Sequence, residues 1–347
     1  MPTLRVWFNQ AYRGGYQLIG LLRDGAAADG LDLYVVGTHT ARSTPFLQAC
    51  DLALPEQEHL TGDDWVEHAL AFCAEHSIDV FVPGRERLAV AEQLDRFTAA
   101  GVRVLVSPAD AVRVLGDKSL AHRVSVSLGV PVPVTHVVHD AAGFRQAYDA
   151  LLAAGLRACL KPAVDHGAKG FRVLDESAGG YDDLLALPSA RVHPDLVERL
   201  IGEQVAQHGR VAPLLVCELL QGDEISVDVL ADDGEVLAAV PRSKGGPQWT
   251  RLLVDDPEAL AITETVVKGL GLRYLCNVQV RYGRGVCRLL EVNTRPASGL
   301  FHSAASGLNL PYAALRLLLD GHVELPDPRL GATVLTYTEA REVTLPF

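Results

Sequence analysis

The segment CNVQVRYGRGVCRLLEVNTRP, residues 276–296, carries oxygen-bearing side chains in an apolar frame. Gln279 lies in its first half, and Glu291 and Asn293 lie two residues apart in its second half. Side chains two residues apart on a β-strand point to one face of the sheet. If the halves pair about the turn at 283–285, one carboxylate and two amide oxygens form an oxygen-only site. Mg²⁺ prefers such a site when a phosphate supplies further ligands. The polar outer face of a half-exposed hairpin is the alternative.

Two lysines occupy positions from which they can bind phosphate groups. Lys161 ends the apolar run RACLKP, where Pro162 stops the strand ladder, and a lysine fixed at a strand end can hold a phosphate as a point charge. Lys118 follows Asp117, which can cap the N-terminus of a helix and leave the lysine to reach another phosphate. Helix capping alone equally explains the Asp117–Lys118 pair.

The loop DHGAKG, residues 165–170, joins two strand-like runs and contains two glycines and Lys169. Backbone N–H groups of such a loop can bind phosphate oxygens, and the loop can also close over a ligand as a lid. An ordinary glycine-containing hairpin is the alternative.

Glu218 and Glu224 flank a tight connection in CELLQGDEISVDVL. The backbone of such a hinge can face an adenine, and a carboxylate just beyond it can accept hydrogen bonds from ribose hydroxyls. Asp223 precedes Glu224, so the sequence leaves open which of these two acids would meet a ribose. Two surface acids on a β-hairpin explain the pattern without a nucleotide.

Arg242 and Lys244, in VPRSKGG, follow another strand-like run and can hold a carboxylate group. A solvated loop is the alternative.

Strand-like runs and helical patterns alternate over about the first 110 residues, which predicts a doubly wound parallel sheet. The strand-like runs cover residues 4–8, 33–36, 78–82 and 102–106. The helical patterns cover residues 63–76 and 85–101. Ligands of such sheets bind beyond the carboxyl ends of the strands, which here are residues 9–15, 37–40 and 83–86. After Ser107 the pattern changes to hairpins and helices, which predicts an α+β architecture.

Composition excludes several classes of protein. The 347 residues predict two to three domains at about 150 residues each. The net charge of −12 disfavours nucleic acid as a main partner, and no run approaches the ~20 apolar residues of a membrane span. The six cysteines are scattered without a C-x-x-C pair, which favours reduced thiols and a cytoplasmic location. Walker A, H-E-x-x-H and G-x-S-x-G motifs are absent from the sequence.

Taken together and in order, these motifs resemble the ATP-grasp family, and the resemblance covers about residues 110–320. The matching segments are DK at 117–118, LKP at 160–162, HGAKG at 166–170, ELLQGDE at 218–224, NVQV at 277–280 and EVNTRP at 291–296. EVNTRP is the most specific of them. The carbamoyl-phosphate-synthetase-like branch, which the sequence resembles most, also places a glutamine at the position of Gln279. The resemblance implies a pre-ATP-grasp domain at 1–110, a small lobe at 111–215 and a large lobe at 216–347.

The resemblance also implies roles for individual residues, with ATP and Mg²⁺, or Mn²⁺ in its place, as cofactors. The expected nucleotide-binding residues are Lys118, Lys161, His166, Gly167, Lys169, Gly170, Glu218, Leu219, Leu220 and Glu224. The expected metal ligands are Gln279, Glu291 and Asn293, with Glu291 bridging two ions. The expected catalytic residues are Arg295, Lys169 and Arg242.

The function that this resemblance implies is an ATP-dependent ligase. It would activate a small-molecule carboxylate as an acyl phosphate, release ADP, and join the acyl group to an amine. A closing loop at 165–170 would protect the acyl phosphate from water. A kinase of the same fold and a non-catalytic ATP-binding module are the alternatives. The sequence leaves the oligomeric state open, with a homodimer as one option.

Overall fold

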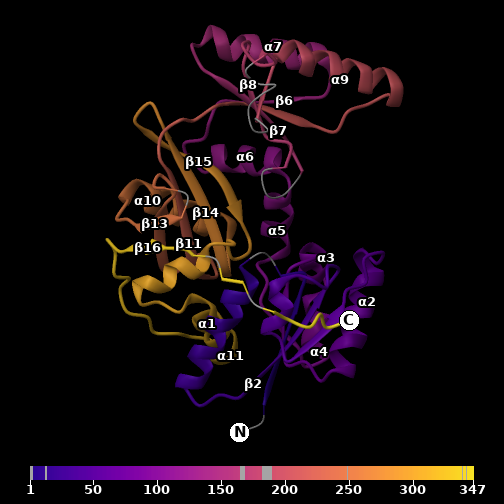
Figure 1. Cartoon of the computed structure of the whole chain (residues 1–347), viewed down its shortest axis with the longest axis vertical. Coiled ribbons are helices and arrows are strands. Elements are labelled where there is room, and N and C mark those ends of the chain that lie inside the picture. Colours follow the sequence, from indigo (N-terminus) through magenta and orange to yellow (C-terminus); the bar gives the residue numbers. More distant parts are fainter. Residues whose placement is uncertain are drawn as a thin grey trace. The chain divides into compact units, whose positions relative to one another are not determined.

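The computed structural model describes residues 3–11, 14–164, 169–181, 190–247, 249–337, 339–340 and 342–347, and its strands form three sheets (Figure 1). Contacts group the chain into two compact units. The first unit comprises Met1–Leu115, Asp223–Val280 and Val292–Phe347. The second unit comprises Gly116–Gly222 and Arg281–Glu291. The three-part division at residues 110 and 215 stays a prediction.

The first unit begins with a five-stranded sheet in the order β3-β2-β1-β4-β5, in which all the pairs are parallel. The strands are β1 (Leu4–Asn9), β2 (Leu33–His39), β3 (Leu52–Pro55), β4 (Val80–Pro83) and β5 (Arg103–Val104). The helices are α1 (Gly15–Ala28), the 3-10 helix η1 (Pro45–Ala49), α2 (Gly62–Glu75), α3 (Arg87–Glu92) and α4 (Leu94–Ala99). The single helix expected over 85–101 is divided at Gln93, and β3 was not expected.

Both faces of this parallel sheet are covered, which confirms the doubly wound arrangement. Trp7 packs with Trp65 of α2 on one face. Its neighbours Val6 and Phe8 pack on the other face with α1 and with α11 (Leu310–Asp320). The alternation along β1 therefore assigns each side chain to one of two apolar layers.

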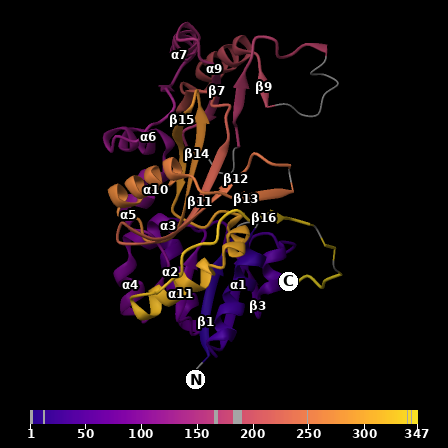
Figure 2. The same cartoon turned by 90° about the vertical axis from the view of Figure 1, so that its left-hand side faces the viewer.

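The second unit contains a five-stranded sheet in the order β6-β10-β7-β8-β9. The strands are β6 (Thr135–Val138), β7 (Ala158–Pro162), β8 (Arg172–Leu174), β9 (Arg191–Val192) and β10 (Leu214–Glu218). Its helices are α6 (Lys118–Ser127), α7 (Ala141–Ala153) and α9 (Pro194–His208), and α5 (Ala109–Gly116) ends at its border. Phe144 of α7 and Ile201 of α9 pack on Leu160 and Val216, so both helices cover one face of this sheet (Figure 2).

The third sheet has the order β15-β14-β11-β12-β13-β16. Its strands are β11 (Glu224–Asp232), β12 (Glu235–Ser243), β13 (Thr250–Leu253), β14 (Tyr274–Gly283), β15 (Val286–Asn293) and β16 (Thr333–Leu335). Helix α10 (Pro257–Leu270) packs against β11 and β12, and the 3-10 helix η2 (Leu300–Ser306) follows β15. Positive φ angles at Asp233–Gly234 and at Arg284–Gly285 give the two hairpin turns that the sequence predicts.

The observed architecture confirms the expected fold class, a parallel α/β sheet followed by mixed and antiparallel sheets. In the part of the chain that the structure describes, no helix combines the length and apolar character needed to cross a membrane.

Candidate functional site

A line of polar side chains follows one face of the third sheet, within the first unit. Glu224, Ser226 and Asp228 alternate along β11, so all three point to this face. Lys244, just after β12, forms an ion pair with Glu224, with 2.5 Å between Nζ and Oε1. The same Nζ lies 3.4 Å from Oε1 of Gln279 on β14. Lys244 therefore links the predicted ribose ligand to one predicted metal ligand.

Gln279 continues this line into the interior. Its Nε2 donates a hydrogen bond to Oδ1 of Asn277 at 3.1 Å, and Nδ2 of Asn277 donates to Oδ1 of Asp228 at 3.0 Å. Asp228 is completely buried and accepts a further bond from Oγ of Ser303 at 2.6 Å. The position of the Gln279 amide is thus coupled to a buried carboxylate two side chains away.

Arg242 completes this polar line but does not face an open site. Its side chain is 2% exposed, and its Nε and Nη2 donate to the two carboxylate oxygens of Asp228 at 2.6 and 3.0 Å. A substrate-carboxylate role for Arg242 stays a prediction, and its guanidinium is already bonded to a carboxylate within the chain. Lys244, from the same sequence motif, lies at the half-buried end of the line.

Sequence reasoning missed Asp228, Asn277 and Ser303. The alternation of Glu224, Ser226 and Asp228 on one strand was the available signal for Asp228. No pattern in the sequence could place Ser303, which is 75 residues away, against it.

The strand β15 carries the other two predicted metal ligands next to β14 in the sheet. Glu291 and Asn293 are half-buried and point to one face by alternation, as the sequence predicts. Glu291 ends the portion of β15 that belongs to the second unit, whereas Asn293 belongs to the first. No group of three His, Cys, Asp or Glu side chains suited to a metal occurs within the described ranges. The predicted set contains one carboxylate and two amides, and it stays a prediction.

The two predicted phosphate-binding lysines lie close together along the backbone of the second unit. Lys161 pairs with Leu215 on β10 and shares with Cys159 the face turned away from α7 and α9. The backbone N–H of Lys118 donates to the carbonyl oxygen of Ala163, two residues beyond Lys161, at 2.9 Å. The start of α6 is therefore attached to the end of β7.

Asp117 caps α6 as expected. Its carboxylate accepts hydrogen bonds from the backbone N–H groups of Ser119 at 2.7 Å and Leu120 at 3.3 Å. Burial of Asp117 opposes its charged form, but these bonds and that from the Ser119 hydroxyl outweigh it, so the pKa of this carboxyl is lowered. The cap fixes the orientation of the turn that carries Lys118.

Part of the predicted phosphate loop, including His166 and Gly167, lies outside the described residues. Lys169 is exposed, and Gly170 adopts a left-handed conformation with φ of 70°. A Cβ at Gly170 would lie 2.7 Å from Cγ of Pro162, so this position requires glycine for both space and backbone conformation. The end of the loop is thereby packed against the strand end that carries Lys161.

The predicted adenine hinge is firmly anchored in the second unit. Glu218 is 6% exposed, and its Oε1 lies 3.8 Å from Nη1 of Arg288, a partner that the sequence did not suggest. The N–H of Leu219 donates to the carbonyl oxygen of Arg157 at 2.7 Å, and Leu220 is buried. The Glu218 side chain is therefore engaged within the protein, and the backbone of this segment is the part suited to meet a base.

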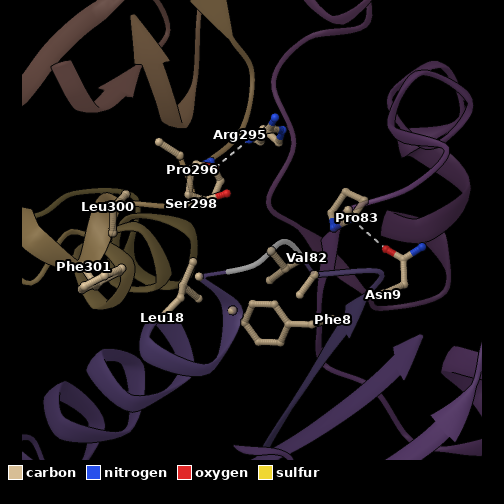
Figure 3. Close-up of a pocket in the computed structure, with 15 residues that line it drawn as sticks. Phe8, Asn9, Leu18, Val82, Pro83, Arg295, Pro296, Ser298, Leu300 and Phe301 are labelled. Carbon is tan, nitrogen blue, oxygen red and sulfur yellow. Dashed lines mark hydrogen bonds between the residues drawn. The ribbon is translucent and has the colours of Figure 1, made fainter. Parts of the chain in front are cut away.

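A pocket of about 550 Å³, part of it open to solvent, lies in the first unit at the carboxyl ends of β1 and β4 (Figure 3). Its lining includes Asn9 and Gly84, from the strand ends where the sequence predicts a ligand. Arg295 and Pro296, which follow β15, form another part of the lining. The predicted catalytic Arg295 thus lies at a pocket formed by the parallel sheet.

Comparison with known proteins finds a family model that matches part of the chain and several distant relatives. A family model described as "ATP-grasp in the biosynthetic pathway with Ter operon" matches residues 210–340. The carbamoyl phosphate synthase large chain of Methanocorpusculum labreanum is 22% identical over 238 residues, which are 65% of this chain and 21% of that protein. The chain spans about a fifth of the length of the curated relatives it matches.

Three solved structures share the fold over most of the chain. The ADP complex of purK, N5-carboxyaminoimidazole ribonucleotide synthetase, has a TM-score of 0.65 and 16% identity, covering 96% of this chain and 80% of that chain. The biotin carboxylase domain dimer of Hydrogenobacter thermophilus 2-oxoglutarate carboxylase was solved with MgADP, ADP and bicarbonate. It has a TM-score of 0.65 and 16% identity, and the match covers 95% of this chain and 73% of that chain. The L-amino acid ligase of Bacillus licheniformis has a TM-score of 0.61 and 16% identity, and the match covers 91% of this chain and 74% of that chain.

Proposed function

Because the chain belongs to the ATP-grasp superfamily, whose members are typically ATP-dependent ligases, we propose that it joins a small-molecule carboxylate to an amine at the expense of ATP. One observation carries this proposal. Asn293 ends the strand of predicted metal ligands, and Arg295, two residues later, lines a pocket suited to a small molecule. The strand that would hold the metal therefore leads directly to a place for the acid.

The proposed ATP-binding groups come from several segments of the chain. Lys118, Lys161 and the loop 166–170 would bind phosphates, and the backbone of 218–220 would bind adenine. Glu224 or Asp223 would meet the ribose. Proteins of similar fold have been solved with ADP and with MgADP, which supports a nucleotide as the ligand.

Gln279, Glu291 and Asn293 are the residues proposed to hold Mg²⁺, because each offers a side-chain oxygen, the ligand type that Mg²⁺ prefers. Bound Mg²⁺ supplies neutralisation of the phosphate charge during transfer. Lys244 would keep the Gln279 amide and the Glu224 carboxylate in place through the contacts described above. Arg242, buried beside Asp228, would act on the same set as a positioning residue.

The proposed reaction has two steps. A carboxylate oxygen of the acid attacks the γ-phosphorus of ATP, so that the bond to ADP breaks and an acyl phosphate forms. The amine nitrogen then attacks the acyl carbon, phosphate leaves, and the nitrogen loses a proton. Arg295 would hold the carboxylate and then the acyl phosphate, and Lys169 would neutralise charge from the loop.

The test is ADP release from ATP and Mg²⁺ in the presence of panels of carboxylic acids, amino acids and amines, with product analysis by mass spectrometry. We expect an amide product and loss of ADP release in Glu291→Ala. Glu235→Ala, which removes an exposed acid at the start of β12, should leave the rate unchanged.

Other outcomes would point to other functions. A stable phosphorylated product without an amide would indicate a kinase, and ADP release that requires bicarbonate would indicate a carboxylase. Nucleotide binding without turnover would indicate a non-catalytic module. The homodimer is part of the proposal, and light scattering coupled to size-exclusion chromatography tests it.

A further inference from the structure

We propose that Arg87, at the start of α3, is a positioning residue for residues 293–296. This segment carries Asn293, a proposed metal ligand, and Arg295, a proposed catalytic residue. The inference rests on the proposed function, because it takes the roles of these two residues from it. It goes further by giving the parallel-sheet domain a part in the reaction, since a side chain beyond the end of β4 would fix where the catalytic segment lies.

The side chain of Arg87 contacts this segment directly. Its Nη1 donates a hydrogen bond to Oγ1 of Thr294 at 2.9 Å, across 207 positions of the chain. Thr294 is 8% exposed, so water has little access to the acceptor. A hydrogen bond with a charged donor is stronger than one between neutral groups, and exclusion of water strengthens it further. Because Thr294 lies between Asn293 and Arg295, the bond restrains the backbone that carries both.

The loop that carries Arg87 is itself held in place. Glu86, which precedes α3, has φ of 52°, and such a conformation persists in a non-glycine residue only where the surroundings hold it. Oε2 of Glu86 accepts a hydrogen bond from the N–H of Gly62 at 3.1 Å. Arg85 donates bonds of 2.7 to 2.8 Å to three carbonyl oxygens of the segment before α2, those of Gln57, Glu58 and Leu60. Arg87 therefore extends towards Thr294 from an anchored support.

A second anchor holds the chain beyond Arg295. The backbone of Gly14 approaches Ser298 so closely that a Cβ at Gly14 would lie 2.3 Å from the carbonyl oxygen of Ser298. Arg295 lies between this contact and Thr294. Besides the pocket at the carboxyl ends of β1 and β4, Arg295 lines a second pocket of about 570 Å³, where Thr294 and the end of β4 also contribute. Loss of the bond at Thr294 would let Arg295 shift relative to both pockets.

The placement of Arg295 matters because this side chain would hold both the acid and the acyl phosphate. A misplacement of about 1 Å in a group that orients a reactant can lower the rate about 100-fold. Loss of the Arg87 bond should therefore act mainly on the acid and on the chemical steps. The KM for ATP should change less than kcat/KM for the acid. A merely structural role would lower stability without this split.

The experiment compares four single variants with the wild type in the assay for ADP release, with the acid and amine that the substrate panels identify. Arg87→Met and Thr294→Val remove the donor or the acceptor at similar side-chain volume, whereas Arg87→Lys and Thr294→Ser keep it. We expect the first two each to lower kcat/KM for the acid about tenfold or more, and the conservative variants to recover part of this loss. The double variant Arg87→Met/Thr294→Val should lose less than the product of the two single losses, because both substitutions remove the same bond.

Hydrogen–deuterium exchange gives a readout that does not depend on turnover. Peptides that span residues 291–299 should lose protection in Arg87→Met and Thr294→Val, whereas peptides of β1 and β2 should keep it. Arg96→Met is the matched control. It removes an exposed arginine of α4 that pairs with Glu67, so it should alter neither the kinetics nor the exchange.

The results separate this inference from the proposed function. If no acid and amine support ADP release but protection at 291–299 falls in Arg87→Met and Thr294→Val, the ligase proposal is wrong and the positioning by Arg87 stands. If an amide forms and these two variants keep the wild-type kcat/KM, the ligase proposal stands and this inference is overturned. Unchanged exchange at 291–299 in both variants overturns it as well. If Arg87→Met does not fold, the comparison of Thr294→Val with Thr294→Ser decides.

Discussion

Replacement of Arg242 by methionine is the sharpest test of the polar line on the third sheet. The guanidinium and the Asp228 carboxylate are 2% and 0% exposed and are joined by two hydrogen bonds. Removal of one member of a buried ion pair costs about 3–5 kcal/mol, because the other charge stays buried without compensation. Asn277 and Ser303 still donate to Asp228, so we expect a loss near the lower limit.

The double variant Arg242→Met/Asp228→Leu separates the charge from the packing. It removes both ions and leaves Ser303 without its acceptor, which costs about 1–3 kcal/mol. Asn277 keeps Val227 and Ser226 as acceptors. We therefore expect the double variant to be more stable than Arg242→Met alone. Arg242→Lys should recover part of the loss, since lysine keeps the charge but cannot bind both carboxylate oxygens side by side.

Urea unfolding followed by circular dichroism at pH 7 measures these differences. A loss below about 1 kcal/mol in Arg242→Met would show that the pair is not buried as described. The single variant Asp228→Leu is measured alongside. If the loss of unfolding free energy in the double variant equals the sum of the losses in Arg242→Met and Asp228→Leu, the two residues do not interact. The concentration of Mg²⁺ that gives half-maximal ADP release should also rise in Arg242→Met, because Asn277 connects Asp228 to Gln279.

Three further predictions follow from other parts of the structure. Within α1, Gly20→Ala should stabilise the protein by about 0.5–1 kcal/mol in urea unfolding, since a Cβ there meets nothing within 4 Å. Gly25→Ala in the same helix should destabilise the protein by about 1–3 kcal/mol, since its Cβ would lie 2.3 Å from Cγ of Tyr312. Equal effects of the two substitutions on stability would contradict the described packing of α1 against α11. Burial lowers the pKa of His302 in the folded protein below its ordinary 6.5. Between pH 6.5 and this lower pKa the unfolded chain therefore binds more protons than the folded protein. The free energy of unfolding should fall as the pH drops through this range. His302→Gln should make the free energy of unfolding less dependent on pH between pH 5 and 7.5, as measured by denaturation curves. An unchanged pH dependence would show that His302 is not its source. Lys161→Ala should raise the KM for ATP about tenfold or more with little change in thermal stability, and an unchanged KM would remove this lysine from the nucleotide site.

Features that depend on neighbours in the sequence were predicted well. The Asp117 cap and the turn at Asp233–Gly234 involve residues two to three positions apart, so local residue types determine them. The parallel sheet follows from short apolar runs separated by helices. The break at Gln93 was missed because the apolar spacing continues through it.

Features that depend on contacts between residues far apart in the chain could not be predicted from the sequence. The sequence shows Arg242 as a charged residue at the end of a strand, and only the register that pairs it with Ser226 reveals the neighbouring Asp228. The pocket beside Asn9 combines residues 8–18 with residues 295–301, which no local pattern connects. The sequence could identify Arg295 and the strand ends separately but could not show that they line one cavity.

The discontinuous first unit has a consequence for synthesis on the ribosome. Helix α1 emerges early, but one of its apolar neighbours, Tyr312 of α11, is about 290 residues further along the chain. Until α11 has been translated, the part of this apolar cluster that Tyr312 and Leu315 cover remains exposed to aggregation. Nascent chains that stop before residue 310 should therefore depend on chaperones, because this layer is completed only once α11 is present.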